Sequence, residues 1–189
     1  KKYRQLPPCS VIPYGAVIVN HPPPSERLQG WGLDPGRYYL IVCRMEPENH
    51  VLDIVQGYLL TQTKRKLVIV GDYNLKTSYA RRISKYIGNE KLCFLGSIYN
   101  KCELIALRYY CFAYFHGHSV GGTNPSMLEA LACGNPIIAH DNCFNKEVAG
   151  ESAIYFKSSA MIPNLMDQIE KNDVLRVEMA NLGRFRIKE

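Results

Sequence analysis

The sequence has few of the features that mark membrane, secreted or disulfide-rich proteins. Its 189 residues contain no apolar run near the roughly 20 residues needed to cross a bilayer. Residues 1–8 are basic and then prolyl, without the apolar segment of a signal peptide. The seven cysteines are odd in number and include no C-x-x-C pair and no spacing typical of metal ligands. We therefore expect a cytoplasmic chain with buried, reduced thiols and no bound metal.

Low-complexity segments and internal repeats are also missing. The formal net charge of +6 favours anionic partners, which include nucleotides, phospholipid head groups and nucleic acid. The basic residues are scattered in short groups at 64–66, 81–82 and 184–188, on predicted helix surfaces and ends. This distribution indicates solvated helix faces rather than a nucleic-acid-binding stripe, so we expect no nucleic-acid partner.

Apolar runs of strand length alternate with segments of helical spacing along most of the chain. Runs that are apolar at every position are typical of strands buried on both faces of a parallel sheet. The expected strands cover residues 38–43, 67–70, 93–95, 112–115, 136–139 and 153–156, and the expected helices cover 51–62, 77–87, 102–108, 125–133, 145–148, 162–171 and 174–186. This alternation predicts a doubly wound, Rossmann-like α/β domain with a parallel sheet. Ligands of such a sheet gather beyond the carboxyl ends of its strands.

The most informative stretch is residues 116–136, HGHSVGGTNPSMLEALACGNP. It describes a strand end, a glycine loop and a helix with both ends marked. Asn124 and Pro125 suit the helix start, and Gly134 suits its end. We therefore expect the glycine loop to lead directly into the amino-terminal end of a helix.

That loop is a candidate phosphate site. Its paired glycines let the backbone approach a ligand, and the free N–H groups at 123–127 lie at the positive end of the helix dipole. The expected phosphate contacts are Gly122, Thr123, Asn124 and Ser126. A plain tight turn into a core helix is the alternative.

Glu129 lies in the same helix, among apolar neighbours at 127–128 and 130–132. Because the helix is apolar nearly all round, we expect the carboxylate to face the protein interior. A buried carboxylate needs a partner. The two hydroxyl donors of a ribose would satisfy it, and a neighbouring arginine or an exposed helix face are the alternatives.

Arg44 follows the first buried strand, where a parallel sheet presents its ligands. Its guanidinium is permanently charged and can clamp a diphosphate through two parallel hydrogen bonds. We therefore expect Arg44 to contact a phosphate. A salt bridge to Glu46 or Glu48 is the alternative.

These motifs carry a family resemblance. Residues 125–139, with the loop before them, closely resemble the donor-domain signature of retaining GT-B glycosyltransferases, in particular the GT4-type enzymes of bacterial surface-polysaccharide assembly. Residues 116–126 resemble a rhamnosyltransferase-like subgroup. The resemblance implies that residues 1–10 are an interdomain linker and that residues 11–189 are the nucleotide-sugar (donor) domain, one half of a two-domain architecture. The acceptor domain, which would precede it, is absent from this sequence.

The resemblance also assigns roles to charged residues. In this family a carboxylate at the place of Glu129 binds the donor ribose. An arginine followed five residues later by a lysine neutralises the leaving diphosphate. Arg44 matches the arginine, whereas the lysine position is Asn49. We accordingly expect Arg44 and Glu129 to be the catalytic residues, with Asn49 at the second phosphate position.

A second glutamate of the family, eight positions before the first, contacts the transferred sugar. That place is Gly121 here, so the expected donor-sugar residues are Gly121 and His118, with His116 and backbone N–H groups as further substitutes. Both histidines could equally be structural. The loop GSIYN resembles the family's base-contacting turn and assigns the base contacts to Ile98 and Asn100, with packing as the alternative role.

The implied reaction moves a sugar from a dTDP- or UDP-linked donor with retention of configuration. The acceptor would be a saccharide or a lipid-linked acceptor held by the absent domain, and the full enzyme would associate peripherally with the membrane. No Asp-x-Asp pair, the metal-chelating device of the other large glycosyltransferase fold, occurs in the sequence, so we expect a metal-independent site without a cofactor. The alternatives are a sugar-nucleotide epimerase or phosphorylase of the same architecture, and a nucleotide-binding module without chemistry.

Overall fold

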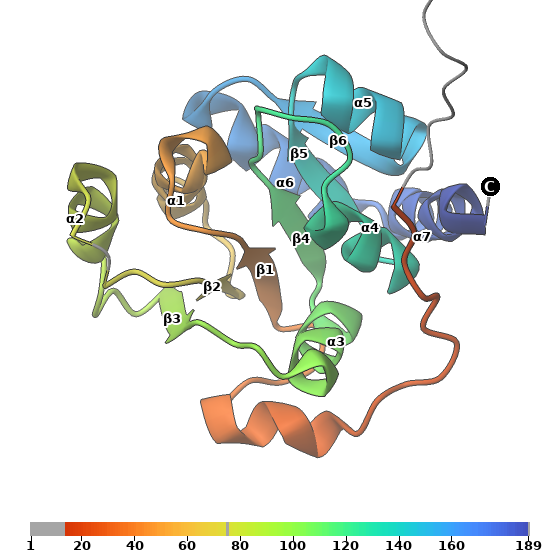
Figure 1. The fold of residues 1–189 in the computed structure, drawn as a ribbon, viewed down its shortest axis with the longest axis horizontal. Helices are drawn as coiled ribbons and strands as arrows, with labels where there is room; N and C mark the ends of the chain where they lie inside the picture. Colours follow the sequence, from red (N-terminus) through yellow and green to blue (C-terminus); the bar gives the residue numbers. More distant parts are fainter. Residues whose placement is uncertain (1–13, 75, 189) are drawn as a thin grey trace, which may run out of the picture.

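The computed structural model describes residues 14–74 and 76–188 and shows a parallel sheet between two layers of helices (Figure 1). The strand order is β3-β2-β1-β4-β5-β6. The chain thus runs outward from the centre of the sheet through β1, β2 and β3, returns to the centre, and runs outward on the other side through β4, β5 and β6. The strands are β1 (Tyr38–Val42), β2 (Lys66–Val70), β3 (Leu92–Gly96), β4 (Ala113–His116), β5 (Ile137–His140) and β6 (Ala153–Phe156). This arrangement confirms the predicted doubly wound, Rossmann-like α/β domain. The predicted linker at residues 1–10 lies outside the described residues.

β1 shows why the strands of this sheet are apolar at successive positions. Tyr38 and Leu40 enter the core on one face of the sheet, and Tyr39 and Ile41 enter the core on the other. Successive side chains of a strand point to opposite faces, so a strand covered on both faces must be apolar throughout. The buried Tyr38 hydroxyl is satisfied, because it donates to the carbonyl of Leu107 at 2.7 Å.

The helices form two layers, according to the core that their apolar sides enter (Figure 1). One layer consists of α1 (Val51–Leu59), α2 (Ser78–Ser84) and α6 (Ile162–Lys171). The other consists of α3 (Lys101–Tyr110), α4 (Pro125–Ala132) and α5 (Cys143–Ala149), with the 3-10 helix η1 (Ser25–Trp31) packed on α3. The last helix, α7 (Asp173–Lys188), packs against α4 and α6. Within residues 14–74 and 76–188, no helix combines the length and apolarity required to traverse a bilayer.

Most predicted elements are present with shifted ends. The helices expected at 51–62 and 77–87 are shorter, because tight turns with hydrogen bonds three residues apart replace their last turns. The helix η1 was not predicted. It buries only Leu28 and therefore leaves no periodic apolar pattern in the sequence.

The expectation of buried thiols is only partly correct. The six cysteines in the described part of the chain are free, and Cys111 and Cys133 are buried. Cys102 and Cys143, however, are exposed, because each lies in the first turn of a surface helix. Cys9 lies outside the described residues.

The centre of the sheet determines where a ligand can bind. The chain leaves β1 and β4 in opposite directions, and this divergence opens a crevice beyond their carboxyl ends. The 3-10 turn η2 (Pro47–Asn49) and the residue after β4, Gly117, come together at this crevice. A Cβ atom on Gly117 would lie 2.0 Å from the carbonyl oxygen of Asn49, so only glycine permits this approach.

We predict that Gly117→Ala lowers the free energy of unfolding by about 1–3 kcal/mol, the usual cost of overpacking a well-packed region. Urea denaturation followed by circular dichroism would measure it. Gly30→Ala is the matched control, because nothing lies within 4 Å of its added Cβ, and we expect its effect to stay within about 0.5 kcal/mol. Equal unfolding midpoints for the two variants would contradict the prediction.

Candidate functional site

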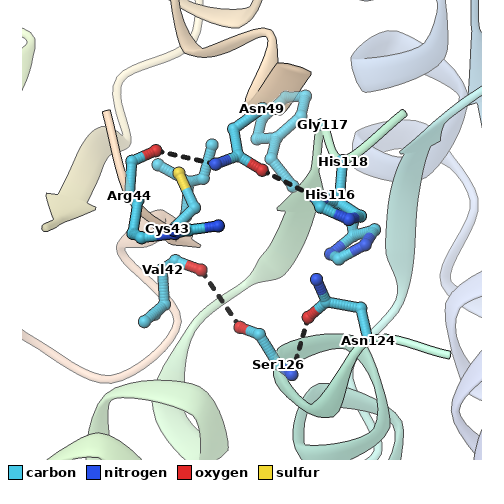
Figure 2. Close-up of a pocket in the computed structure, with 11 residues that line it drawn as sticks. Val42, Cys43, Arg44, Asn49, His116, Gly117, His118, Asn124 and Ser126 are labelled. Atoms are coloured by element: carbon cyan, nitrogen blue, oxygen red, sulfur yellow. Dashed lines mark hydrogen bonds between the residues drawn. The ribbon is translucent and has the colours of Figure 1, made fainter. Parts of the chain in front are cut away.

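The crevice beyond β1 and β4 contains a pocket of about 190 Å³ (Figure 2). Its walls come from the turn after β1, from the end of β4 with the residues that follow, and from the start of α4. Its polar lining residues are Arg44, Asn49, His116, His118, Asn124 and Ser126. The sequence analysis named each of them, and the fold brings them together from positions up to 82 residues apart.

A wider groove of about 560 Å³ continues from this pocket toward the turns that follow β2 and β3. The groove and the pocket share Arg44, Asn124 and Ser126, so they form one continuous depression. Ile98, assigned to the base, and Glu129, assigned to the ribose, both line the groove. The groove thus contains Ile98 and Glu129, the part shared with the pocket contains Arg44, and the pocket contains His118.

Four predicted residues do not belong to the lining of either cavity. Gly121, Gly122 and Thr123 form the loop between β4 and α4, and Gly121 has a positive φ of 98°, which favours glycine. The side-chain oxygen of Asn100 caps α3 and accepts the N–H of Cys102 at 2.9 Å.

Side chains fix the start of α4. Asn124 is its N-cap, as predicted, and its Oδ1 accepts the N–H of Ser126 at 2.9 Å. The Ser126 hydroxyl donates to the carbonyl of Val42 at 3.0 Å and lies 2.5 Å from the hydroxyl of Tyr114. Ser126 thus ties α4 to β1 and β4, and both its N–H and its hydroxyl already have partners.

Arg44 lies at the junction of the pocket and the groove, with an exposed side chain. In the described part of the chain, no carboxylate lies within ion-pair distance of its guanidinium. The alternative of a salt bridge to Glu46 or Glu48 is therefore not realised. This leaves a positive charge at the centre of the depression for an anionic ligand.

Asn49 is 4% exposed, and both ends of its amide are engaged (Figure 2). Its Nδ2 donates to the carbonyl oxygen of Arg44 at 2.8 Å, and its Oδ1 lies 2.8 Å from Nδ1 of His118. The side chain thus joins the turn after β1 to the residues after β4. This is a bridging position, whereas the sequence predicted a second phosphate contact.

His116 is the most buried titratable group in the pocket, at 4% exposed. Burial, and then the neighbouring His118, lowers the pKa of His116 to about 3, so its imidazole is neutral at physiological pH. Its Nε2 is buried and has no hydrogen-bond partner among the described residues. A buried polar atom without a hydrogen-bond partner is uncommon in folded proteins.

The expectation that Glu129 faces the protein interior is wrong. Its side chain is 51% exposed, because this side of α4 borders the groove. The alternative of a neighbouring arginine is realised: Nη2 of Arg108 lies 2.7 Å from Oε2 of Glu129. Sequence reasoning did not identify Arg108 as a site residue, although an arginine in the apolar stretch of α3 was an available signal.

Arg108 is a buried cation, at 3% exposed. Besides Glu129 it contacts the Ser126 hydroxyl through Nη2 at 3.3 Å, and its Nε has no partner in the described part of the chain. Burying an arginine is unfavourable unless a carboxylate compensates its charge. Arg108 and Glu129 therefore hold each other in place at the wall of the groove.

Metal ligands do not gather at this site. Among residues 14–74 and 76–188, no group of three or more His, Cys, Asp or Glu side chains is arranged to hold a metal ion. The charged side chains that line the depression are Arg44, Arg108, Asp72 and Glu129, whereas His116 is neutral. The arrangement suits an anionic ligand at its centre and hydroxyl groups on either side.

Several solved structures share this fold. HepE of Anabaena, in complex with UDP and glucose, aligns with a TM-score of 0.75 and 16% identity over 87% of this chain and 46% of that one. Sucrose-phosphate synthase from Thermosynechococcus elongatus aligns with a TM-score of 0.75 and 19% identity, over 94% of this chain and 47% of that one. The C-terminal domain of the glycosyl transferase group 1 family protein LpcC from Francisella tularensis aligns with a TM-score of 0.71 and 17% identity, over 91% of this chain and 93% of that one. The chain thus spans about half the length of the first two proteins, and at these identities the likeness shows the fold alone.

Sequence comparison identifies the family. No curated protein matches the chain. The family profile described as Glycosyl transferases group 1 matches residues 30–185, which is well over half of the chain. The chain therefore belongs to the glycosyl transferases group 1 family.

Proposed function

We propose that this chain is the donor-binding domain of a GT4-type glycosyltransferase that transfers a sugar, with retention of configuration and without a metal, from a nucleoside-diphosphate sugar. The observation that carries the proposal is the continuous depression at the centre of the sheet, with an unpaired arginine at its midpoint. It offers a base-sized groove on one side and a sugar-sized pocket on the other. The binding of UDP and glucose by HepE, which has the same fold, supports this assignment.

The wide end of the depression suits a nucleoside. Ile98 and the 88% exposed Tyr99 offer apolar surface beside which a base can lie. Glu129 lies farther along the groove, with one carboxylate oxygen held by Arg108. The other oxygen is left to accept a ribose hydroxyl, so we assign ribose binding to Glu129.

The junction suits the diphosphate. Departure of a nucleoside diphosphate builds negative charge on the β-phosphate oxygens, and groups that stabilise this charge accelerate the reaction. Arg44 supplies a full positive charge there, and the amino-terminal end of α4 supplies a partial one. Of the predicted phosphate contacts, Ser126 already has its hydrogen bonds within the protein, so we assign the role to Arg44 and to backbone N–H groups around Thr123 and Asn124.

The pocket beyond the junction suits the transferred sugar: His118 lines it, and Gly121 lies next to His118. The HGHSVGGTNPS motif supports a rhamnosyltransferase-like enzyme of bacterial surface-polysaccharide assembly with a dTDP- or UDP-linked donor. The acceptor, a saccharide or a lipid-linked acceptor, is held by a second domain. In this proposal the full enzyme works in the cytoplasm at the inner face of the membrane, without a cofactor.

Arg44→Ala should weaken UDP binding by about 2 kcal/mol, because it removes a charge-assisted contact to phosphate. Uridine affinity should not change, since the nucleoside does not reach Arg44. Isothermal titration of both ligands measures this. Arg82→Ala, an exposed arginine on α2, is the matched control and should bind UDP like the parent. Equal UDP affinity of the parent and Arg44→Ala would remove Arg44 from the site.

Glu129→Gln leaves the buried Arg108 without its carboxylate, so we expect a less stable protein that still folds. The folded variant should discriminate poorly between UDP and 2′-deoxy-UDP, because a carboxylate accepts a ribose hydroxyl better than a neutral amide does. If the parent itself does not distinguish the two, 3′-deoxy nucleotides make the same test. Glu147→Gln, an exposed glutamate on α5, is the control. Discrimination that is unchanged from the parent in both series would refute ribose binding by Glu129.

The chain by itself should bind nucleotide yet transfer no sugar. Catalysis by positioning requires both substrates to be held in a closed, water-excluded site, and the depression here is open along its length. Incubation with UDP-glucose, dTDP-rhamnose and lipid-linked saccharides should yield no glycoside above a protein-free blank. Acceptor-dependent transfer by this chain alone would contradict the need for a second domain.

A further inference from the structure

The contacts of Asn49 determine which end of its side-chain amide donates a hydrogen bond and which end accepts one. A backbone carbonyl can only accept, so the amide atom that faces the Arg44 carbonyl at 2.8 Å must be the Nδ2 donor. The opposite end of the amide is then Oδ1, which can only accept. This oxygen lies 2.8 Å from Nδ1 of His118. His118 must therefore carry a hydrogen on Nδ1.

The other nitrogen of the ring follows from this. A neutral imidazole carries one hydrogen, so a ring protonated at Nδ1 has an unprotonated Nε2, which is an acceptor. Nε2 of His118 faces the glycine loop, 3.7 Å from the Cβ position of Gly121. The loop glycine leaves the space beside Nε2 open, and His118 lines the pocket.

The rest of the pocket indicates what this acceptor would meet. His116 lines the same pocket, and its buried Nε2 has no partner among the described residues. The side-chain oxygen of Asn124 is occupied by the Ser126 N–H, which leaves its amide N–H₂ as a donor. No carboxylate lines this pocket. Arg44, at the junction with the groove, would meet the anionic part of a ligand. The part that fills the rest of the pocket is then uncharged and carries several hydroxyl groups, as a hexose does.

We infer that Asn49 is a positioning residue that holds His118 in its Nδ1-protonated form, so that Nε2 accepts a hydroxyl hydrogen from the donor sugar. The inference rests on the proposed function for the identity of the ligand. Asn49 occupies the place where the family resemblance expects a lysine. A lysine ammonium could not accept from Nδ1, so the lysine that the resemblance expects could not make this contact.

The first test measures the tautomer directly in the ligand-free chain. The ¹⁵N shifts of the histidine ring nitrogens, recorded at a pH where His118 is neutral, distinguish the two forms. The parent should show His118 protonated at Nδ1. Asn49→Ser shortens the side chain and removes the acceptor, so His118 should return to the Nε2-protonated form that free histidine prefers. Asn49→Asp keeps an oxygen toward Nδ1 and should keep the parent form.

A matched control separates positioning from general damage. Asn135 is also buried and donates from Nδ2 to a backbone carbonyl, that of Arg108, at 2.6 Å. Asn135→Ser should lower thermal stability by an amount comparable with Asn49→Ser while leaving the His118 shifts unchanged. His118 protonated at Nε2 in the parent, or at Nδ1 in Asn49→Ser, would overturn the inference.

The second test asks whether the sugar uses this acceptor. The ratio of the dissociation constants of UDP and UDP-glucose, measured by titration, isolates the contribution of the sugar. In Asn49→Ser this ratio should fall about tenfold, which is the loss of one well-made hydrogen bond, while UDP affinity stays near that of the parent. UDP-N-acetylglucosamine provides a second sugar.

The two tests fail in different ways. If UDP does not bind the parent, the proposed function is wrong, and the ring shifts still decide whether Asn49 controls the tautomer. If UDP binds but Asn49→Ser leaves the ratio unchanged for both sugars, the inferred sugar contact of His118 is wrong although the nucleotide site stands.

Discussion

The contact on which the site depends is the approach of the turn η2 to the residue after β4. At Gly117 the two backbones come so close that no side chain fits between them. This contact places Arg44 and Asn49, from the first half of the sheet, against His116 and His118, from the second half. The doubly wound topology opens the crevice, and Gly117 lets η2 approach the residues after β4 closely, which leaves a pocket of about 190 Å³.

A second interaction fixes the positions of α3 and α4, the helices beside the depression, relative to each other. The buried guanidinium of Arg108 extends from α3 to the Ser126 hydroxyl and the Glu129 carboxylate on α4. Ser126 in turn donates to the carbonyl of Val42 at the end of β1. Because a buried cation is costly without its anion, the network resists separation of α3 from α4. The wall assigned to the ribose is thereby coupled to the strand end that presents Arg44.

The charge that lines the depression changes along its length. Its midpoint carries the unpaired Arg44, whereas the pocket beyond contains His116, which burial keeps neutral. A ligand with a charged centre and an uncharged, hydroxylated end matches this gradient. Two of the polar groups that line the pocket, Asn49 and His118, are fixed by each other rather than by solvent, so their hydrogen-bonding directions exist before a ligand arrives.

The sequence by itself determined the sheet and the glycine loop, because apolar periodicity and the caps at Asn124 and Pro125 are local signals. It also located Arg44, which follows a strand, and Glu129, which lies in the helix after the glycine loop. Only the tertiary structure decided their partners. Glu129 was expected in the interior and proved half exposed beside Arg108, and Asn49 proved to bridge Arg44 and His118. Burial and hydrogen bonding between residues 21 to 69 positions apart depend on how helices pack across the sheet, which no local pattern records.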